Sequence, residues 1–172
     1  MPSLQPYSTF GLAASCDSIQ SFSDVTSFLS IFNTSKNNNK AIYILGGGSN
    51  SVFTDDFDGT ILVNEIKGIS HFDTESHHYL RVGAGENWHD FVTLCMKEKW
   101  YGFENLALIP GSVGACPIQN IGAYGREVNT LIDKVECVFL ETGEQVLLSN
   151  EDGAICSEIC SFGPQQISQA VR

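Results

Sequence analysis

The stretch Ile109-Pro-Gly-Ser-Val-Gly-Ala-Cys-Pro-Ile-Gln-Asn-Ile-Gly-Ala-Tyr-Gly125 is the most informative part of the sequence. In it, small residues alternate with isolated apolar ones, and no residue is acidic or basic. It is too rich in glycine for a helix and too irregular for a strand. A backbone folded closely around a flat, largely apolar ligand would explain the pattern, with N–H groups and Asn120 supplying hydrogen bonds. The alternative is an Ω-type surface loop, although such loops usually carry more charge. Tyr124 could cover a ring, or it could be a core tyrosine whose hydroxyl has a partner.

A second glycine-rich stretch, Gly46-Gly-Gly-Ser-Asn50, directly follows the apolar run Ala41-Ile-Tyr-Ile-Leu45, which predicts a buried strand. Consecutive glycines let a backbone adopt positive φ and approach a ligand closely, and we expect this at Gly47. Successive N–H groups in such a turn can bind an anion, and Ser49 adds a hydroxyl donor. An ordinary flexible turn is the alternative. The stretch is neither the dinucleotide fingerprint Gly-x-Gly-x-x-Gly nor a Walker loop with its Lys.

The order of the remaining elements predicts a mixed α/β protein, with parallel strand pairing first and antiparallel pairing later. We expect a helix over residues 23–32 capped by Ser23, and a second over residues 88–99 capped by Asn87. The run Glu86-Asn-Trp-His89 could be a catalytic cluster, but a helix start with a packed Trp is the better interpretation. Further expectations are a loop over residues 33–40, a turn at Asp58-Gly59, strands over residues 61–63 and 79–82, and a hairpin of residues 135–140 and 145–148.

The composition is that of a folded, acidic protein. The chain has 172 residues, of which 42% are hydrophobic, and this share is too high for a disordered chain. A formal net charge of −11 argues against nucleic acid as a partner, because phosphates need Lys and Arg along a face. It does not exclude a nucleotide cofactor, since backbone N–H groups can hold a pyrophosphate. No window approaches the ~20 apolar residues that span a bilayer, and the start lacks the features of a secretory signal. We therefore expect no membrane segment.

The cysteines and histidines do not predict a metal site. Six cysteines are scattered along the chain, and we expect reduced thiols in a cytoplasmic protein. Cys156 and Cys160 are closely spaced, but no His follows them at zinc-finger spacing. His77 and His78 could ligate a metal, yet neighbouring residues of a strand point to opposite faces. A solvated strand end is therefore the favoured interpretation of this pair.

Four runs of the sequence carry a family resemblance. They are Leu45-Gly-Gly-Gly-Ser-Asn50, Val82-Gly-Ala-Gly-Glu-Asn-Trp88, Glu104-Asn-Leu-Ala-Leu-Ile-Pro-Gly-Ser-Val-Gly114 and Pro117-Ile-Gln-Asn-Ile-Gly-Ala-Tyr-Gly125. These runs closely resemble the UDP-N-acetylenolpyruvoylglucosamine reductases, flavoenzymes that complete UDP-N-acetylmuramate for bacterial peptidoglycan. The opening, with Thr9-Phe-Gly11, also fits the start of that family. The resemblance covers about the first 150 residues.

The resemblance implies an α+β fold, namely a p-cresol-methylhydroxylase-type FAD-binding domain over residues 1–152. It would consist of two α/β lobes, about residues 1–70 and 71–152, with the flavin between them. The first lobe would hold a small parallel sheet and the second mainly antiparallel strands. The turn after Leu45 would bind the pyrophosphate, and residues 109–124 the rest of the cofactor. The implied FAD-binding residues are Leu45, Gly46, Gly47, Gly48, Ser49, Asn50, Ile109, Pro110, Gly111, Ser112, Gly114, Ala115, Ile118, Asn120, Gly122 and Tyr124.

The reaction, too, comes from the resemblance. NADPH would pass a hydride to FAD, and the reduced flavin would pass it to the double bond of UDP-N-acetylglucosamine-enolpyruvate. The implied partners are small molecules, the nucleotide-sugar substrate and NADPH, and a monomer is expected. The implied setting is the cytoplasm and the biogenesis of the cell wall, and with it cell shape and cell division.

The sequence departs from the family after Asp152. The family continues there into a Tyr-Arg motif and a substrate domain with a serine proton donor and a late catalytic glutamate, and residues 153–172 match none of these. We therefore expect a divergent tail that follows a frameshift or premature stop, and a very slow complete reaction, because enolate stabilisation and a proton donor are missing. One alternative is a non-enzymatic flavin-binding or inert remnant. Another is a flavoprotein of the same fold that oxidises a small alcohol, against which the run Ile118-Gln-Asn-Ile-Gly-Ala-Tyr124 argues.

Overall fold

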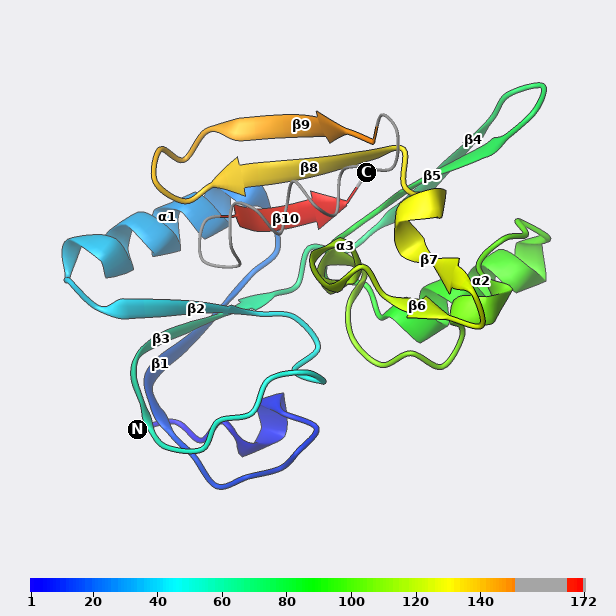
Figure 1. The fold of residues 1–172 in the computed structure, drawn as a ribbon. Coiled ribbons are helices and arrows are strands. Elements are labelled where there is room, and N and C mark those ends of the chain that lie inside the picture. The colour runs from blue at the N-terminus through cyan, green and yellow to red at the C-terminus, as the bar shows by residue number, and fades with distance from the viewer. Residues whose placement is uncertain (151–166, 172) are drawn as a thin grey trace. The chain divides into compact units, whose positions relative to one another are not determined.

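The protein consists of two units, Met1–Ile66 and Lys67–Arg172, and each contains both helices and strands (Figure 1). The computed structural model describes residues 1–150 and the backbone of residues 167–171. The sheet of the first unit is parallel, and the strand pairs described in the second unit are all antiparallel. The expected α+β fold, with a small parallel sheet followed by antiparallel ones, is thereby confirmed.

The first unit is built on a sheet with the strand order β1 (Cys16–Phe22), β3 (Phe57–Asn64), β2 (Ala41–Leu45). The central strand β3 is buried along residues 59–63, as expected of a strand in a parallel sheet. The turn predicted at Asp58-Gly59 is wrong, because both residues lie inside β3. Glycine is needed there for close packing: a Cβ atom would lie 2.3 Å from a carbonyl oxygen of β2. A short 3-10 helix, η1 (Gln5–Tyr7), precedes the sheet.

Helix α1 (Val25–Asn37) lies between β1 and β2 in the sequence, and its cap differs from the predicted one. Asp24, rather than Ser23, precedes the first helical residue. Asp24 Oδ1 accepts a 2.7 Å hydrogen bond from the Ser27 N–H, and Ser27 Oγ in turn accepts one from the Asp24 N–H. This reciprocal capping box leaves two N–H groups of the first turn satisfied, which fixes the start of the helix.

The same helix is longer than predicted, so the loop expected over residues 33–40 is wrong for its first five residues. The buried side of α1 consists of Phe28, Phe32 and Ser35, and the other residues after Phe32 are exposed. The apolar signal therefore ends about one turn before the helix does. Backbone hydrogen bonding continues through the exposed polar turn because such side chains do not oppose it strongly.

The second unit begins with an antiparallel hairpin of β4 (Ile69–Asp73) and β5 (His78–Val82). Helix α2 (Trp88–Glu98) follows, and the predicted cap is confirmed. Asn87 Oδ1 accepts a 3.0 Å hydrogen bond from the N–H of Asp90, a contact that satisfies one N–H of the first turn.

Trp88 lies in the core of the second unit, which confirms the interpretation of a helix start with a packed tryptophan. Its indole Nε1 donates a 2.7 Å hydrogen bond to the carbonyl oxygen of Leu106, so the buried polar atom has a partner. The buried members of this core come from β5, α2 and the chain that follows; they are Val82, Trp88, Phe91, Val92, Cys95, Leu106, Val113, Cys116 and Val128.

Only short elements lie between α2 and the last sheet. They are η2 (Glu104–Leu106), η3 (Val113–Ala115), α3 (Cys116–Gln119), β6 (Gly122–Ala123), β7 (Arg126–Glu127) and η4 (Val128–Leu131). The last sheet has the order β10 (Ile167–Val171), β8 (Lys134–Phe139), β9 (Gln145–Ser149). The predicted hairpin is thus confirmed, and its turn closes with a 2.7 Å hydrogen bond from the Gly143 N–H to the Phe139 carbonyl oxygen.

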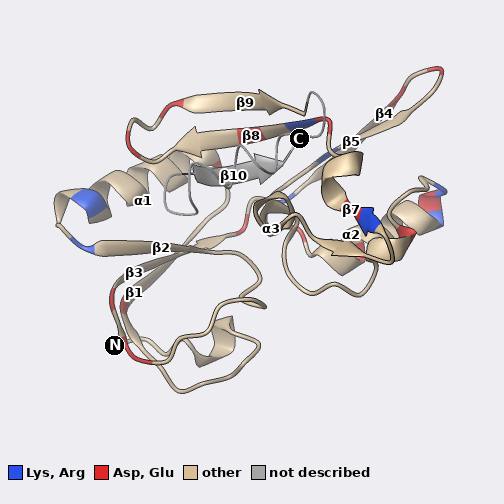
Figure 2. Cartoon of the chain, in the orientation of Figure 1, with Lys and Arg blue, Asp and Glu red and all other residues tan. Residues whose placement is uncertain are grey.

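Charged residues occur in both units, but two stretches of the chain contain none (Figure 2). Residues 41–54 and 105–125 contain no Asp, Glu, Lys or Arg. These two stretches include all sixteen residues that the family resemblance assigns to FAD. No helix among the described residues is long and apolar enough to cross a membrane.

The four cysteines in the described part of the chain are free and buried; they are Cys16, Cys95, Cys116 and Cys137. Burial raises the pKa of the Cys95 and Cys137 thiols to about 12, and it also raises that of Cys116. A thiol with so high a pKa carries almost no thiolate at neutral pH, so these side chains fill space. Cys156 and Cys160 lie outside the described residues.

Candidate functional site

The glycine-rich stretch Gly46-Gly-Gly-Ser-Asn50 forms a turn at the carboxyl end of β2. Leu45, the last residue of the strand, is fully buried in the core of the first unit. The next two glycines lead to the surface: Gly46 is half-buried and Gly47 is exposed. Ligand sites in parallel sheets commonly lie at the carboxyl ends of the strands, because the chain turns there and its N–H groups become accessible.

Gly48 is the glycine that the fold requires in this turn. It has φ of 63°, whereas Gly47 does not have a positive φ, so the conformation expected at Gly47 occurs one residue later. A Cβ atom on Gly48 would lie 1.9 Å from the carbonyl oxygen of Tyr7. The Gly48 carbonyl oxygen also accepts a 3.2 Å hydrogen bond from the Thr9 N–H. The N-terminal segment thus fixes the far side of the turn and leaves the backbone of Gly46 and Gly47 more open.

The end of this turn is held by hydroxyl groups. Ser8 Oγ donates a 2.9 Å hydrogen bond to the carbonyl oxygen of Ser51, and Ser51 Oγ is 3.0 Å from the hydroxyl of Tyr43. The hydroxyl of Ser49 makes no hydrogen bond within the described part of the chain, and Asn50 is exposed. The turn therefore places the Ser49 hydroxyl, which has no hydrogen-bond partner in the described part of the chain, close in sequence to the exposed backbone of Gly47.

The glycine-rich stretch of residues 109–125 contains regular structure, contrary to the prediction. Residues 113–115 form η3 and residues 116–119 form α3, so a helix is compatible with this composition. Pro117 is tolerated because it lies in the first turn, where its missing N–H would have no helical partner. The helix ends at Asn120, whose φ of 42° is left-handed, a conformation that Asn adopts more readily than most residues.

Backbone contacts with the run Val82-Gly-Ala-Gly-Glu-Asn-Trp88 hold the start of this stretch. The N–H of Trp88 donates to the Gly111 carbonyl oxygen at 3.0 Å, and the N–H of Val113 donates to that of Glu86 at 2.9 Å. Ser112 forms an isolated bridge with Asn87 and is buried. The two runs of the family pattern are therefore joined through their backbones.

Gly114 lies at the closest point between these two runs. Its N–H donates a 2.8 Å hydrogen bond to the carbonyl oxygen of Ala84. A Cβ atom on Gly114 would lie 2.7 Å from the Ala84 Cβ, so any larger residue must displace one of the runs. This glycine, like Gly48, is required by packing within its own unit.

Tyr124 is the most exposed aromatic residue of the candidate site. Its side chain is 90% exposed, which is incompatible with the alternative of a core tyrosine. Its φ of 52° is left-handed, as is that of Leu108 (64°), a residue that is also exposed. Non-glycine residues in this conformation cost of order 1–3 kcal/mol and cluster at functional sites. The backbone thus holds two large apolar side chains at the surface on either side of residues 109–123.

The side chain of Asn120 has partners inside the loop. Its Nδ2 donates a 2.9 Å hydrogen bond to Glu127 Oε2, and its Oδ1 accepts one of 3.3 Å from the Asn129 N–H. Gly122 lies in β6, where a Cβ atom would be 3.0 Å from the Arg126 carbonyl oxygen. These contacts shape the turn around Tyr124.

The other residues of this stretch that the resemblance assigns to FAD differ in exposure. Pro110 is exposed, and the half-buried ones are Ile109, Gly111, Ala115 and Ile118. A groove of about 870 Å³ in the second unit is lined by Val113, Cys116 and Pro117, but by none of the sixteen residues that the resemblance assigns to FAD. Cys116 is buried and its Sγ donates a 3.3 Å hydrogen bond to the Ser112 carbonyl oxygen, which agrees with a space-filling role.

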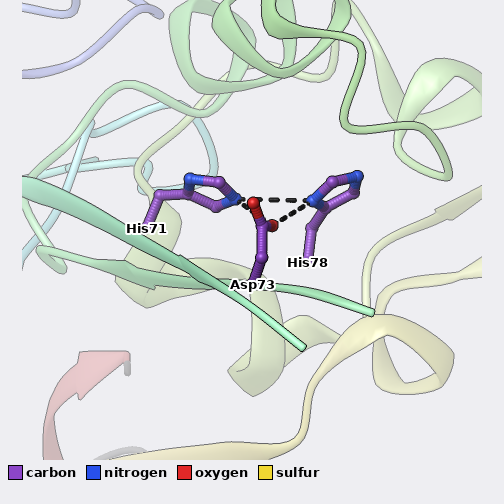
Figure 3. A group of neighbouring side chains, drawn as sticks. All are labelled: His71, Asp73 and His78. Carbon is purple, nitrogen blue, oxygen red and sulfur yellow. Dashed lines mark hydrogen bonds and ion pairs between the residues drawn. The ribbon is translucent and has the colours of Figure 1, made fainter. Parts of the chain in front are cut away.

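The structure also brings together three side chains that the sequence pattern alone did not connect. His71 and Asp73 on β4 and His78 on β5 point toward one another (Figure 3). Pairing of the two strands creates this cluster, so the sequence signal was a His-x-Asp spacing followed by a short turn and a further His.

Comparisons with known proteins agree with the fold. The model of a family described as FAD binding domain matches residues 21–149, which is more than half of the chain. The solved structure of UDP-N-acetylenolpyruvylglucosamine reductase from Thermus caldophilus superposes with a TM-score of 0.64 at 20% sequence identity. That superposition covers 88% of this chain and 52% of the other, and it shows a shared fold.

Curated relatives are more similar in sequence. The chain is 46% identical over 149 residues to UDP-N-acetylenolpyruvoylglucosamine reductase of Photorhabdus laumondii, which covers 87% of this chain and 44% of that protein. It is 44% identical over 161 residues to the protein of the same name from Escherichia coli O157:H7, with 94% of this chain and 45% of the relative covered. The chain thus spans less than half the length of these relatives. It belongs to the FAD binding domain family, and its resemblance to the UDP-N-acetylenolpyruvoylglucosamine reductases is confirmed.

Proposed function

We propose that this chain is the FAD-binding part of a UDP-N-acetylenolpyruvoylglucosamine reductase of peptidoglycan synthesis. The observation that carries the proposal is the family match over residues 21–149, because this range contains both uncharged glycine-rich stretches. Identities of 44–46% with curated reductases support the more specific assignment.

The turn Gly46-Gly-Gly-Ser-Asn50 would bind the pyrophosphate of FAD. Gly47 is exposed at the end of a buried strand, and Ser49 offers a hydroxyl without a partner in the described chain. No basic side chain occurs in residues 41–54, so the anion would be held by backbone N–H dipoles and this hydroxyl. Such binding is compatible with the net charge of −11. The residues of the turn therefore fit an anionic cofactor.

The stretch from Ile109 to Tyr124 would bind the rest of the cofactor. It supplies half-buried apolar side chains at Ile109 and Ile118, and the exposed ring of Tyr124 is available to cover a flat ligand. Asn120 uses one amide N–H on Glu127, and its second N–H can still donate. Contacts to the run Val82 to Trp88 orient this stretch, as described above.

When bound, FAD would supply the redox chemistry by carrying a hydride from NADPH to the enolpyruvyl double bond of the substrate. The residues of this chain would bind and orient the cofactor. A proton donor and a cation beside the developing enolate are also required, and residues 153–172 contain no Tyr-Arg pair. We infer that the 172-residue chain binds FAD, in the cytoplasm and as a monomer, but completes the reduction very slowly. Within residues 1–150 all four cysteines are free and buried, and this supports a reducing compartment.

Two measurements on the purified chain test this proposal. Absorbance in the flavin bands after titration with FAD and removal of free cofactor should show one bound flavin per chain, and absence of binding would favour the inert remnant. The bound flavin is then reduced chemically under anaerobic conditions and mixed with UDP-N-acetylglucosamine-enolpyruvate. We expect no reoxidation within seconds, because loss of an electrostatic group costs ~10²–10³ in rate and loss of a proton donor ~10²–10⁴. Fast reoxidation with formation of the saccharide product would show that the chain supplies the missing groups.

A further inference from the structure

The His71, Asp73 and His78 side chains converge on one face of the β4–β5 hairpin (Figure 3). His71 Nε2 lies 2.7 Å from Asp73 Oδ1, and His78 Nδ1 lies 2.5 Å from the same oxygen. The two imidazole nitrogens are 3.4 Å apart. All three atoms are metal-ligating atoms, and all lie within 4.8 Å of one another.

Strand geometry explains why these three side chains share a face. His71 and Asp73 are two residues apart on β4, so they point to the same side of the hairpin. His78 is the direct cross-strand partner of Asp73, and directly opposite residues also share a side. The cluster thus follows from the register of the hairpin and needs no unusual backbone.

Aromatic contacts restrict the freedom of this cluster. Phe72 and Tyr79 are also cross-strand partners, and their rings stack with centroids 5.0 Å apart and planes 4° apart. They occupy the opposite face of the hairpin, because they alternate with the cluster residues along each strand. The ring of His71 packs on Trp100 at 4.2 Å between centroids. Both contacts reduce the entropy that ligand groups lose when a cation orders them.

We infer that His71, Asp73 and His78 form a binding site for a divalent transition-metal ion of the zinc type. Two imidazoles and one carboxylate suit such borderline cations and suit magnesium or calcium poorly, since those prefer oxygen ligands. Three protein ligands leave one tetrahedral position for water. This site is independent of the proposed FAD site, whose sixteen residues include none of the three.

The distances fit a tetrahedral ion after a small adjustment. Ligand atoms ~2.0–2.1 Å from zinc lie roughly 3.3 Å apart in a tetrahedron, close to the 3.4 Å between His71 Nε2 and His78 Nδ1. The Asp73 oxygen lies closer to both nitrogens, at hydrogen-bonding distance. It must retreat by less than 1 Å, which an exposed carboxylate can do by side-chain rotation.

The test uses the full 172-residue chain without a histidine tag, stripped with a chelator and titrated calorimetrically with zinc chloride. We expect one zinc per chain at this site, and His71→Ala, Asp73→Asn and His78→Ala should each weaken it at least ~10-fold, the lower limit seen even for groups outside the ligand shell. Cobalt(II) in place of zinc should give the visible absorption of a four-coordinate site, and this absorption should disappear in His78→Ala.

His77→Ala is the matched control. His77 is exposed and adjacent in sequence to His78, but its Nδ1 contacts Ser76 Oγ at 2.8 Å and it belongs to the opposite side of the hairpin. Its replacement should leave zinc affinity unchanged, as should the double change Cys156→Ser and Cys160→Ser. Circular dichroism checks that each variant is folded. Absence of zinc binding overturns the inference, and so does equal weakening in His77→Ala or unchanged affinity in the three ligand variants.

Discussion

The two glycine-rich stretches look alike in sequence, but their glycines have different roles. In the turn after β2, Gly48 has left-handed φ and abuts the backbone of Tyr7. In the stretch after α2, Gly114 has no such φ and abuts Ala84. Both glycines are required by packing inside one unit, whereas Gly47 is exposed. A glycine-rich motif thus contains residues that the fold requires beside residues that leave backbone open to a ligand, and only the second kind tests ligand binding.

Gly48→Ala should have the largest effect on stability. The new Cβ would lie 1.9 Å from the Tyr7 carbonyl oxygen, and the residue would also keep a left-handed φ. We expect the free energy of unfolding to fall by about 2–5 kcal/mol, the sum of overpacking and conformational strain. Urea unfolding followed by far-UV circular dichroism, which reports on the helices and strands of both units, measures this change.

Gly11→Ala is the matched control for Gly48. Gly11 has φ of 62°, but no atom lies within 4 Å of its added Cβ. In Gly11→Ala the free energy of unfolding should therefore fall only by the cost of the left-handed conformation, about 1–2 kcal/mol. Equal losses of unfolding free energy in Gly48→Ala and Gly11→Ala would show that the close approach to Tyr7 is unimportant. They would contradict the claim that packing requires Gly48.

Gly114→Ala should lower the free energy of unfolding by an intermediate amount, about 1–3 kcal/mol, because it causes overpacking without a left-handed φ. The Cβ of Ala84 is the nearest atom, at 2.7 Å. The double variant Gly114→Ala and Ala84→Gly should therefore recover part of the loss in the same unfolding assay. If the double variant recovers no stability, the destabilising clash is not with the Ala84 side chain.

Cysteine modification of the folded chain and replacement of Cys116 are expected to have the smallest effects. The raised pKa values of Cys95, Cys116 and Cys137 leave almost no thiolate at pH 8 in the folded chain. Iodoacetamide should not alkylate these residues at pH 8 until urea is added, as read by mass spectrometry of peptides. Cys116→Ala should retain FAD. Rapid labelling of Cys116 in the folded protein, or complete loss of flavin in the variant, would contradict a space-filling role.

Local signals predicted the elements that local interactions determine. The Asn87 cap and the hairpin of β8 and β9 are confirmed because each depends on a few neighbouring residues. The start of α1 was missed by one residue, since Ser23 and Asp24 are both good caps and only the reciprocal bond with Ser27 distinguishes them.

Long-range contacts account for the other errors. Asp58-Gly59 indicates a turn in isolation, but the close approach of β2 explains the glycine inside a strand. The positive φ expected at Gly47 falls on Gly48 because Tyr7, far away in sequence, fixes it. The cluster of His71, Asp73 and His78 depends on strand register, which adjacent histidines alone do not show. The FAD contacts themselves stay a prediction.

The most direct test of the central claim is FAD binding to the chain and to its Gly47→Val variant. Gly47 is exposed and lacks a positive φ, so this change should alter the free energy of unfolding by no more than about 0.5 kcal/mol. The added side chain would nevertheless cover the backbone that is proposed to bind the pyrophosphate. Flavin absorbance after equilibration with FAD and removal of free cofactor should show one FAD per wild-type chain and a large loss in an equally stable variant. Unchanged flavin content in Gly47→Val, or no flavin bound to the wild-type chain, would contradict the account.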